Sequence, residues 1–97
     1  METAKSRTDI DNALNRVTTW TFRLGERTGE HVHQLPYVVV PLTSGTLVIQ
    51  SDDATSSSDL APGGCYFREA GVAHDVVNGG AEELVFVSRL RLRTSGN

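Results

Sequence analysis

The stretch GERTGEHVHQLPYVVVPLTSG, residues 25–45, decides how this chain is expected to fold. It opens with turn-forming residues, passes two histidines one residue apart, and continues into the β-branched run YVVVPL at 37–42. β-Branched residues favour strands, and side chains two residues apart in a strand point to the same face. The sequence therefore predicts a strand that aims His31 and His33 at one point.

Short runs rich in β-branched and aromatic residues, separated by Gly, Pro and Ser, continue on both sides of this stretch. No segment has the period of an amphipathic helix. We expect strands at 10–24, 37–42, 45–50, 65–68, 74–77 and 83–93. Pro41 would cost a central strand one ladder hydrogen bond, so it is expected at an edge, a bulge or a strand end. Many short strands with turn residues between them are typical of an all-β sandwich or barrel.

Three local expectations complete this picture. Thr43 and Ser44 separate two β-rich runs, so we predict a hairpin there. The polar segment SDDATSSSD at 51–59 is expected to be an exposed loop. Residues 1–9 are expected to be a mobile N-terminal segment, and 10–97 are expected to form a single domain.

Composition excludes some classes of partner. The 97 residues include 9 basic and 12 acidic side chains, and the formal net charge is -3, which argues against nucleic acid or an anionic membrane as a partner. The single cysteine, Cys65, cannot form an internal disulfide, and no segment is long enough to span a bilayer, so we expect a cytoplasmic protein. Because so small a barrel leaves apolar strand faces outside, we expect a homodimer with Trp20 or Val39 as contacts.

The chain has three histidines, and the third, His74, begins another predicted strand. Neutral imidazole is the commonest metal ligand, and a pair of imidazoles on one face needs only one or two further donors to hold a metal ion. The pair alone is a weak signal, because a surface or capping pair has the same spacing. A third histidine brought across from an opposing strand favours a metal site.

The spacing of the glycines around the first two histidines resembles the first cupin motif. That motif runs Gly, five residues, His-x-His, three or four residues, Glu, six residues and Gly. The corresponding residues here are Gly25, His31, His33, Val38 and Gly45. Valine stands in place of the glutamate.

A second cupin motif is also matched. It runs Gly, five residues, Pro-x-Gly, two residues, His, three residues and Asn. The corresponding residues here are Gly63, Glu69, Gly71, His74 and Asn78, with glutamate in place of proline. The chain most resembles the small single-domain cupins associated with beta-alanine degradation, which carry the YVVVPLT and YFR-x-AGV-x-H sequences found here. The resemblance implies a small conical β-barrel of the jelly-roll kind, a double-stranded β-helix.

In most cupins, the resemblance implies, two histidines, one glutamate and a third histidine surround a divalent metal. Val38 cannot ligate a metal, so the site either keeps the imidazoles of His31, His33 and His74 or has lost its metal. Three neutral ligands still hold iron, nickel or zinc. They leave the full charge of the dication in a partly apolar cavity, which is expected to prefer an anionic small molecule.

Three residues are candidates for contact with such a substrate. Arg68 would clamp a carboxylate if it faces inward, or would pair with Glu69 or Asp75 if it faces outward. Tyr66 shares the face of Arg68 by the two-residue period of a strand. Val38 is expected to line the site in place of the missing ligand.

Two functions remain open, and the catalytic residues stay unassigned. One is a metal-dependent oxygenase, resembling the thiol dioxygenases of the cupin superfamily, that acts on a small anionic substrate. The alternative is a non-catalytic barrel that binds or senses a small acid. A purely structural barrel without a metal is a third reading.

Overall fold

The computed structural model describes residues 3–32, 34–51, 54–71 and 73–91. The strands are β1 (Lys5–Asp11), β2 (Asn15–Phe22), β3 (His31–Val32), β4 (Tyr37–Pro41), β5 (Gly45–Gln50), β6 (Thr55–Leu60), β7 (Tyr66–Arg68), β8 (Ala73–Asn78) and β9 (Leu84–Arg91). The described residues contain no helix, and therefore none that could cross a membrane. The predicted all-β class is confirmed.

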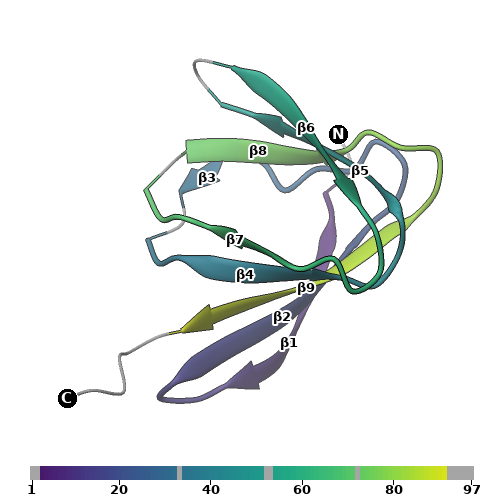
Figure 1. The fold of residues 1–97 in the computed structure, drawn as a ribbon. Helices are drawn as coiled ribbons and strands as arrows, with labels where there is room; N and C mark the ends of the chain where they lie inside the picture. The colour runs from purple at the N-terminus through teal and green to yellow at the C-terminus, as the bar shows by residue number, and fades with distance from the viewer. Residues whose placement is uncertain (1–2, 33, 52–53, 72, 92–97) are drawn as a thin grey trace.

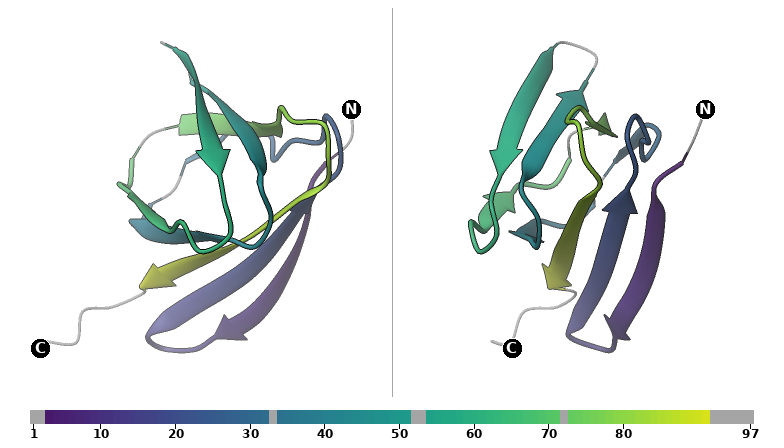
Figure 2. Two further views of the ribbon diagram at one scale, coloured as in Figure 1. Left: turned by 45° about the vertical axis from the view of Figure 1, so that its right-hand side comes forward. Right: turned by 90° about the vertical axis from the view of Figure 1, so that its right-hand side faces the viewer.

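The strands form two antiparallel sheets that face each other (Figure 1). One has five strands in the order β1-β2-β9-β4-β7, and the other has four in the order β3-β8-β5-β6. Figure 2 shows the two sheets from further sides. In the described part of the chain, no edge strand of one sheet pairs along its length with an edge strand of the other. The barrel is therefore a pair of facing sheets that hydrogen bonds do not close.

Alternation along the strands brings large apolar side chains together between the sheets. Phe22 of β2 and Leu84 of β9 are fully buried. The ring of Phe22 stacks on that of Phe86, with centroids 5.6 Å apart. Trp20 lies on the same face of β2 and donates from Nε1 to Ser88 Oγ at 3.2 Å. Each fully buried side chain of this kind stabilises the fold by about 1.5–3 kcal/mol, so this cluster anchors the five-stranded sheet.

β4 has apolar side chains on both of its faces. The inward side chains, Tyr37, Val39 and Pro41, are buried. The outward side chains, Val38 and Val40, are half-buried. Pro41 is the last residue of the strand, which is one of the positions predicted for it.

The predicted hairpin at Thr43 and Ser44 is wrong. β4 pairs with β7 and β9 in one sheet, whereas β5 pairs with β6 and β8 in the other. Turn residues between two β-rich runs suit a connection that crosses from sheet to sheet as well as they suit a hairpin. Local sequence alone does not separate the two.

Two polar segments form strands that the sequence did not predict. Most of the expected loop at 51–59 belongs to β6, which pairs with β5 along its whole length. β1 begins at Lys5, inside the segment 1–9 that was expected to lack structure, and all of its residues are exposed. Both are edge strands held by backbone pairing rather than by burial. They therefore lack the apolar alternation by which a sequence reveals a strand.

β1 carries a bulge at Asp9, where its register against β2 shifts between Thr8 and Ile10. Asp9 accepts hydrogen bonds from Thr19 Oγ1 at 2.5 Å and from Arg7 Nε at 2.7 Å. These bonds hold the pKa of the Asp9 carboxyl below its usual value. The β1–β2 hairpin lies at the edge of its sheet that is remote from the four-stranded sheet (Figure 1).

Candidate functional site

β8 places the third histidine inside the molecule. Burial alternates along the strand, so His74, Val76 and Asn78 face inward, whereas Asp75 lies on the other face. The His74 side chain lines a cavity between the sheets, and its Nε2 atom is buried. His74 can therefore present an imidazole nitrogen to a molecule held in that cavity.

The first histidine lies directly opposite the third. β3 pairs antiparallel with β8, and in this register His31 is the partner of His74. Side chains of directly opposite residues share one face of a sheet, with their Cβ atoms about 5 Å apart. The backbone therefore brings positions 31 and 74 side by side. His33 and the side chain of His31 lie outside the described residues.

Several hydrogen bonds fix the loop before β3 to β8. Arg27 Nε donates to Asp75 Oδ2 at 2.6 Å, and the backbone N–H of Gly29 donates to Asp75 Oδ1 at 3.1 Å. The N–H of Thr28 bonds to the carbonyl of Val76 at 2.9 Å, and Thr28 Oγ1 accepts from the N–H of Val76 at 3.2 Å. Asp75 therefore fixes the position of the loop that leads to His31.

The cavity beside His74, called here the inner cavity, has a volume of about 50 Å³. Most of its wall is apolar and includes Val39, Leu47 and Phe86, which are all buried. Its polar side chains come from both sheets. No Asp or Glu is found among the described residues that line it.

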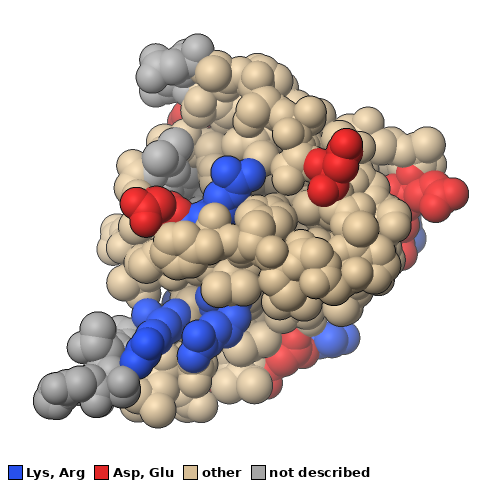
Figure 3. Space-filling model, in the orientation of Figure 1, with Lys and Arg blue, Asp and Glu red and all other residues tan. Residues whose placement is uncertain are grey.

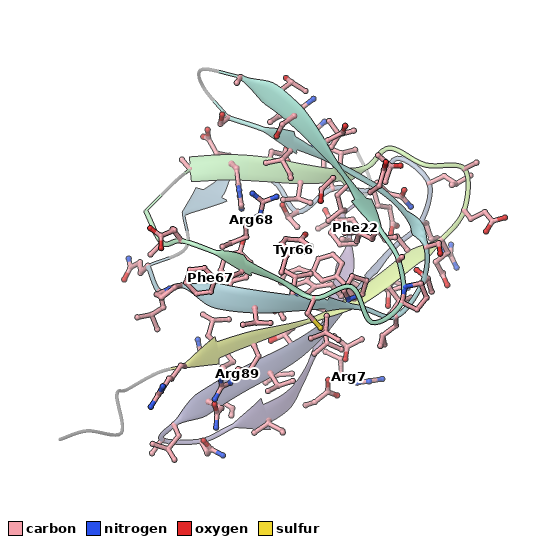
Figure 4. The ribbon with its side chains drawn as sticks, in the orientation of Figure 1. Arg7, Phe22, Tyr66, Phe67, Arg68 and Arg89 are labelled. Atoms are coloured by element: carbon pink, nitrogen blue, oxygen red, sulfur yellow. The ribbon has the colours of Figure 1, made fainter. Side chains whose placement is uncertain are left out.

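A cross-strand pair from the five-stranded sheet joins His74 in this wall. Tyr37 of β4 lies directly opposite Arg68 of β7, and Val39 lies opposite Tyr66. The Arg68 guanidinium carbon is 5.0 Å from the centroid of the Tyr66 ring, a cation–π contact. Tyr66 and Arg68 point from β7 into the space between the sheets (Figure 4), on the inward face considered for them. The outward alternative of an Arg68–Asp75 pair is not what the structure shows, because Asp75 pairs with Arg27.

Burial raises the pKa of both tyrosines in this wall. It raises the pKa of Tyr37 to about 12, an effect that nearby Tyr66 reinforces and Arg68 opposes. Burial also raises the pKa of Tyr66, against the lowering effects of the Arg68 charge and of hydrogen bonds with Arg68 and Ser58. At neutral pH both phenols are uncharged. The guanidinium of Arg68 is the fixed positive charge among the described residues of the wall.

A wider outer cavity of about 350 Å³ adjoins the inner one, and its wall includes Ser51, Ser56, Phe67 and Glu69. Four residues line both cavities and form what is called here the neck: Tyr37, Ile49, Arg68 and His74. The neck joins the apolar interior to a wider entrance whose wall mixes apolar and polar side chains.

Val38 was expected to line the site, but its side chain lies on the opposite face of β4. Its neighbours Tyr37 and Val39 line the inner cavity, whereas Val38 pairs with Phe67 and Arg89. Tyr37 therefore holds the inward position after the histidine pair. The first motif allows three or four residues before this position, and counting three leads to Tyr37. Sequence reasoning counted four and missed this tyrosine.

The donors at the site suit a divalent transition metal. His74 presents a buried imidazole nitrogen, and residue 31 beside it is also a histidine. Imidazole is a good ligand for iron, nickel and zinc. The side chains that the structure describes contain no cluster of three metal-ligating groups, and His33 and the His31 side chain are not among them.

Comparisons with known proteins agree on the fold. No family model matches the chain. It is 49% identical over 78 residues to the beta-alanine degradation protein BauB of Pseudomonas aeruginosa. The aligned residues cover 80% of this chain and 82% of that protein. The crystal structure of a cupin domain from Bordetella pertussis superposes with a TM-score of 0.88 at 39% identity, covering 93% of this chain and 94% of that one.

A more distant structure shows the same architecture. It is an RmlC-like cupin family protein with a double-stranded β-helix fold from Methanocaldococcus jannaschii. The TM-score is 0.77 at 12% identity, over 94% of this chain and 82% of that one. The predicted double-stranded β-helix is confirmed.

Proposed function

The chain belongs to the cupin family, and from this premise we propose that it holds a divalent transition metal with His31, His33 and His74 and binds a small anion beside it. One observation carries the proposal. His31 lies directly opposite His74, and the buried imidazole of His74 lines a cavity that the guanidinium of Arg68 also lines. This arrangement combines metal donors with an anion-binding group.

The charges of the site favour an anionic ligand. Arg68 contributes one positive charge, and no described carboxylate lines the inner cavity to offset it or the charge of a metal. At an effective dielectric constant of about 20, opposite unit charges about 4 Å apart attract by about 4 kcal/mol. An anion that lies between the histidines and Arg68 would satisfy both centres.

We propose that the activity is a metal-dependent oxygenation of a small carboxylate. When bound, the metal supplies a Lewis-acid centre that can also take part in redox chemistry if it is iron. Arg68 would orient the carboxylate, and the apolar inner wall would exclude water from the reacting carbon. The related protein BauB is named for beta-alanine degradation. Beta-alanine carries a carboxylate, so compounds from its breakdown are the first substrates to test.

A second candidate is a barrel that binds a small acid without converting it. No Asp or Glu is among the described residues that line the inner cavity, which favours this reading because no carboxylate there can act as a general base. Conversion of a bound acid to a product would support the oxygenase, and binding without conversion would support the binding barrel.

The test begins with metal analysis of the purified chain after exposure to iron, nickel and zinc in turn. We expect one metal per chain, lost in His33→Ala and His74→Gln and kept in Arg89→Gln, whose side chain is exposed. A chain that binds none of the three metals would contradict the proposal. Oxygen uptake with a panel of thiols and short carboxylic acids then decides the activity. Consumption of oxygen supports the oxygenase, whereas ligand binding without consumption supports the binding barrel.

A further inference from the structure

The two cavities that meet at the neck differ in chemistry. The inner cavity is walled by side chains such as Val39 and Leu47, each 3% exposed. The outer cavity has a mixed wall, in which the exposed side chains of Ser56, Phe67 and Glu69 take part. A hydrocarbon group therefore leaves water more completely in the small inner cavity than in the wide, partly exposed outer cavity.

Charge places the polar end of a ligand between these two regions. Arg68 lines both cavities, and its cation–π contact with Tyr66 holds the planar guanidinium in place. A guanidinium in a fixed orientation suits the two oxygens of a carboxylate. Glu69 lines the outer cavity, where its negative charge repels an anion that moves outward. The neck is therefore the favourable position for a carboxylate.

The size of the inner cavity limits what can follow the carboxylate inward. Its volume is about 50 Å³. A water molecule needs about 10–15 Å³ measured in this way, so the cavity accepts about four groups of the size of a methylene. A longer tail would have to displace buried side chains.

We infer that the site takes a short aliphatic carboxylate, with the carboxylate at Arg68 in the neck and the hydrocarbon tail in the inner cavity. The inference rests on the proposed function for the choice of an anionic ligand. It adds an orientation and a limit on chain length that a metal site alone does not set.

A homologous series of probes tests the limit. Acetate, propionate, butyrate, pentanoate and octanoate are titrated into the chain by calorimetry. Affinity is expected to rise by about fourfold for each methylene that enters the inner cavity, and to fall again once the tail exceeds about four carbons. An affinity that is independent of length, or that still rises at octanoate, would overturn the inference.

The position of the carboxylate is tested at Arg68. Arg68→Gln should weaken butyrate binding by at least tenfold. Arg89→Gln removes the same charge from the exposed face of β9, where Arg89 bonds to Asn15 Oδ1 at 2.7 Å, and should leave binding unchanged. Figure 4 shows Arg89 apart from Tyr66 and Arg68. Butyramide, which has the shape of butyrate without the charge, should bind at least tenfold more weakly. Equal binding of the amide and the acid would exclude a carboxylate subsite.

The position of the tail is tested by a pair of variants in the inner wall. Leu47→Val enlarges the inner cavity and should move the optimum toward longer acids. Val76→Ile fills it and should move the optimum toward shorter ones. Acetate binding serves as the internal control, because its single methyl group scarcely enters the cavity. If acetate binding is kept and neither optimum moves, the tail does not lie where it is placed here.

Running the series on metal-free and zinc-loaded protein separates this inference from the proposed function. A length optimum in a chain that takes no metal would support the inference and contradict the metal site. Metal binding without a length optimum would do the reverse.

Discussion

Arg27 and Asp75 form an ion pair, with Nη2 and Oδ2 2.5 Å apart, that ties the loop before the first histidine to the strand that carries the third. Their side chains are only 25% and 17% exposed, so water screens the pair incompletely. Arg27 also donates to Gln50 Oε1 at 2.7 Å. The pair lies on the face of β8 opposite the cavity and supports the site from behind.

Asp75→Ala is therefore expected to lower the free energy of unfolding by about 1–3 kcal/mol, because it leaves the Arg27 guanidinium and the Gly29 N–H without this acceptor. Asp59→Ala is the matched control. Asp59 is exposed and accepts one hydrogen bond, from Thr46 Oγ1, so its loss should cost under about 0.5 kcal/mol. Urea unfolding measures both variants. Equal costs would show that the Arg27–Asp75 pair contributes no more than a surface contact.

Asn78 is expected to be intolerant of an isosteric change. It is 3% exposed, and its Nδ2 donates to the carbonyls of Phe22 and Glu82 while its Oδ1 accepts from the N–H of Gly80. Asn78→Asp would turn an oxygen toward those carbonyls and should cost about 3 kcal/mol or more. Asn15→Asp is the control, because Asn15 Oδ1 only accepts from Arg89 and an aspartate can still do so. Thermal unfolding at neutral pH should separate the two variants clearly.

Gly45 and Leu84 predict a steric effect at the last glycine of the first motif. A Cβ atom at position 45 would lie 2.6 Å from Leu84 Cδ1, and Leu84 is fully buried. Gly45→Ala should therefore cost about 1–3 kcal/mol. In a chain that already carries Gly45→Ala, Leu84→Val should cost less stability than Leu84→Val costs in the wild-type chain. Gly80→Ala, whose Cβ would meet only ordinary contacts of 3.4 Å or more, should be near neutral. A near-neutral Gly45→Ala would show that Leu84 can move aside.

Stability should fall at alkaline pH because of Tyr37. Its pKa rises from 10.0 to about 12 on folding. The folded chain therefore keeps a proton that the unfolded chain loses, and the free energy of unfolding should drop by about 1.4 kcal/mol per pH unit between these two values. Below pH 10 this effect is absent. Tyr37→Phe should remove that share of the slope, which denaturant unfolding at stepped pH would measure. Tyr66 titrates in the same direction, so some slope should remain.

The homodimer stays a prediction, but the structure favours other contact residues than Trp20 and Val39. Val39 is 3% exposed and Trp20 lines the inner cavity, so neither side chain is on the outer surface. The outer face of β4 and β7 is largely uncharged (Figure 3); Phe67 of β7 is 57% exposed, and Leu42, directly after β4, is 52% exposed. Leu42→Glu should shift the mass measured by light scattering toward the monomer. Leu24→Glu, at a loop residue that is 58% exposed, should not. A wild-type chain that is monomeric at micromolar concentration would refute the dimer.

The sequence predicted those parts of the fold in which burial leaves a periodic signal. β2, β4, β8 and β9 each bury one face. Inward residues two positions apart, such as Trp20 and Phe22 or His74 and Val76, can be recognised in the sequence without coordinates. β1 and β6 bury almost nothing, so their polar sequences look like loops. The crossing from β4 to β5 depends on which strands lie opposite across the whole chain, and local turn chemistry does not carry that information.

The candidate site was predicted to a similar degree. The two motifs correctly brought positions 31 and 74 together and located the strand of Tyr66 and Arg68, whereas His33 lies outside the described residues. They did not fix which of two neighbouring residues faces inward on β4. A single added residue in the preceding loop exchanges the faces of a strand, and Tyr37 rather than Val38 proved to be the inward one.

The bulge at Asp9 has a consequence for the behaviour of the protein at high concentration. An edge strand with all its residues exposed offers backbone groups to strands of other molecules, which is how ordered aggregates grow. The bulge bends β1 in its middle, so an incoming strand can match only part of its length. Lys5 and Arg7 on the same strand repel a second copy that approaches in parallel register. The bulge at Asp9 thus limits polymerisation at this exposed edge of the five-stranded sheet.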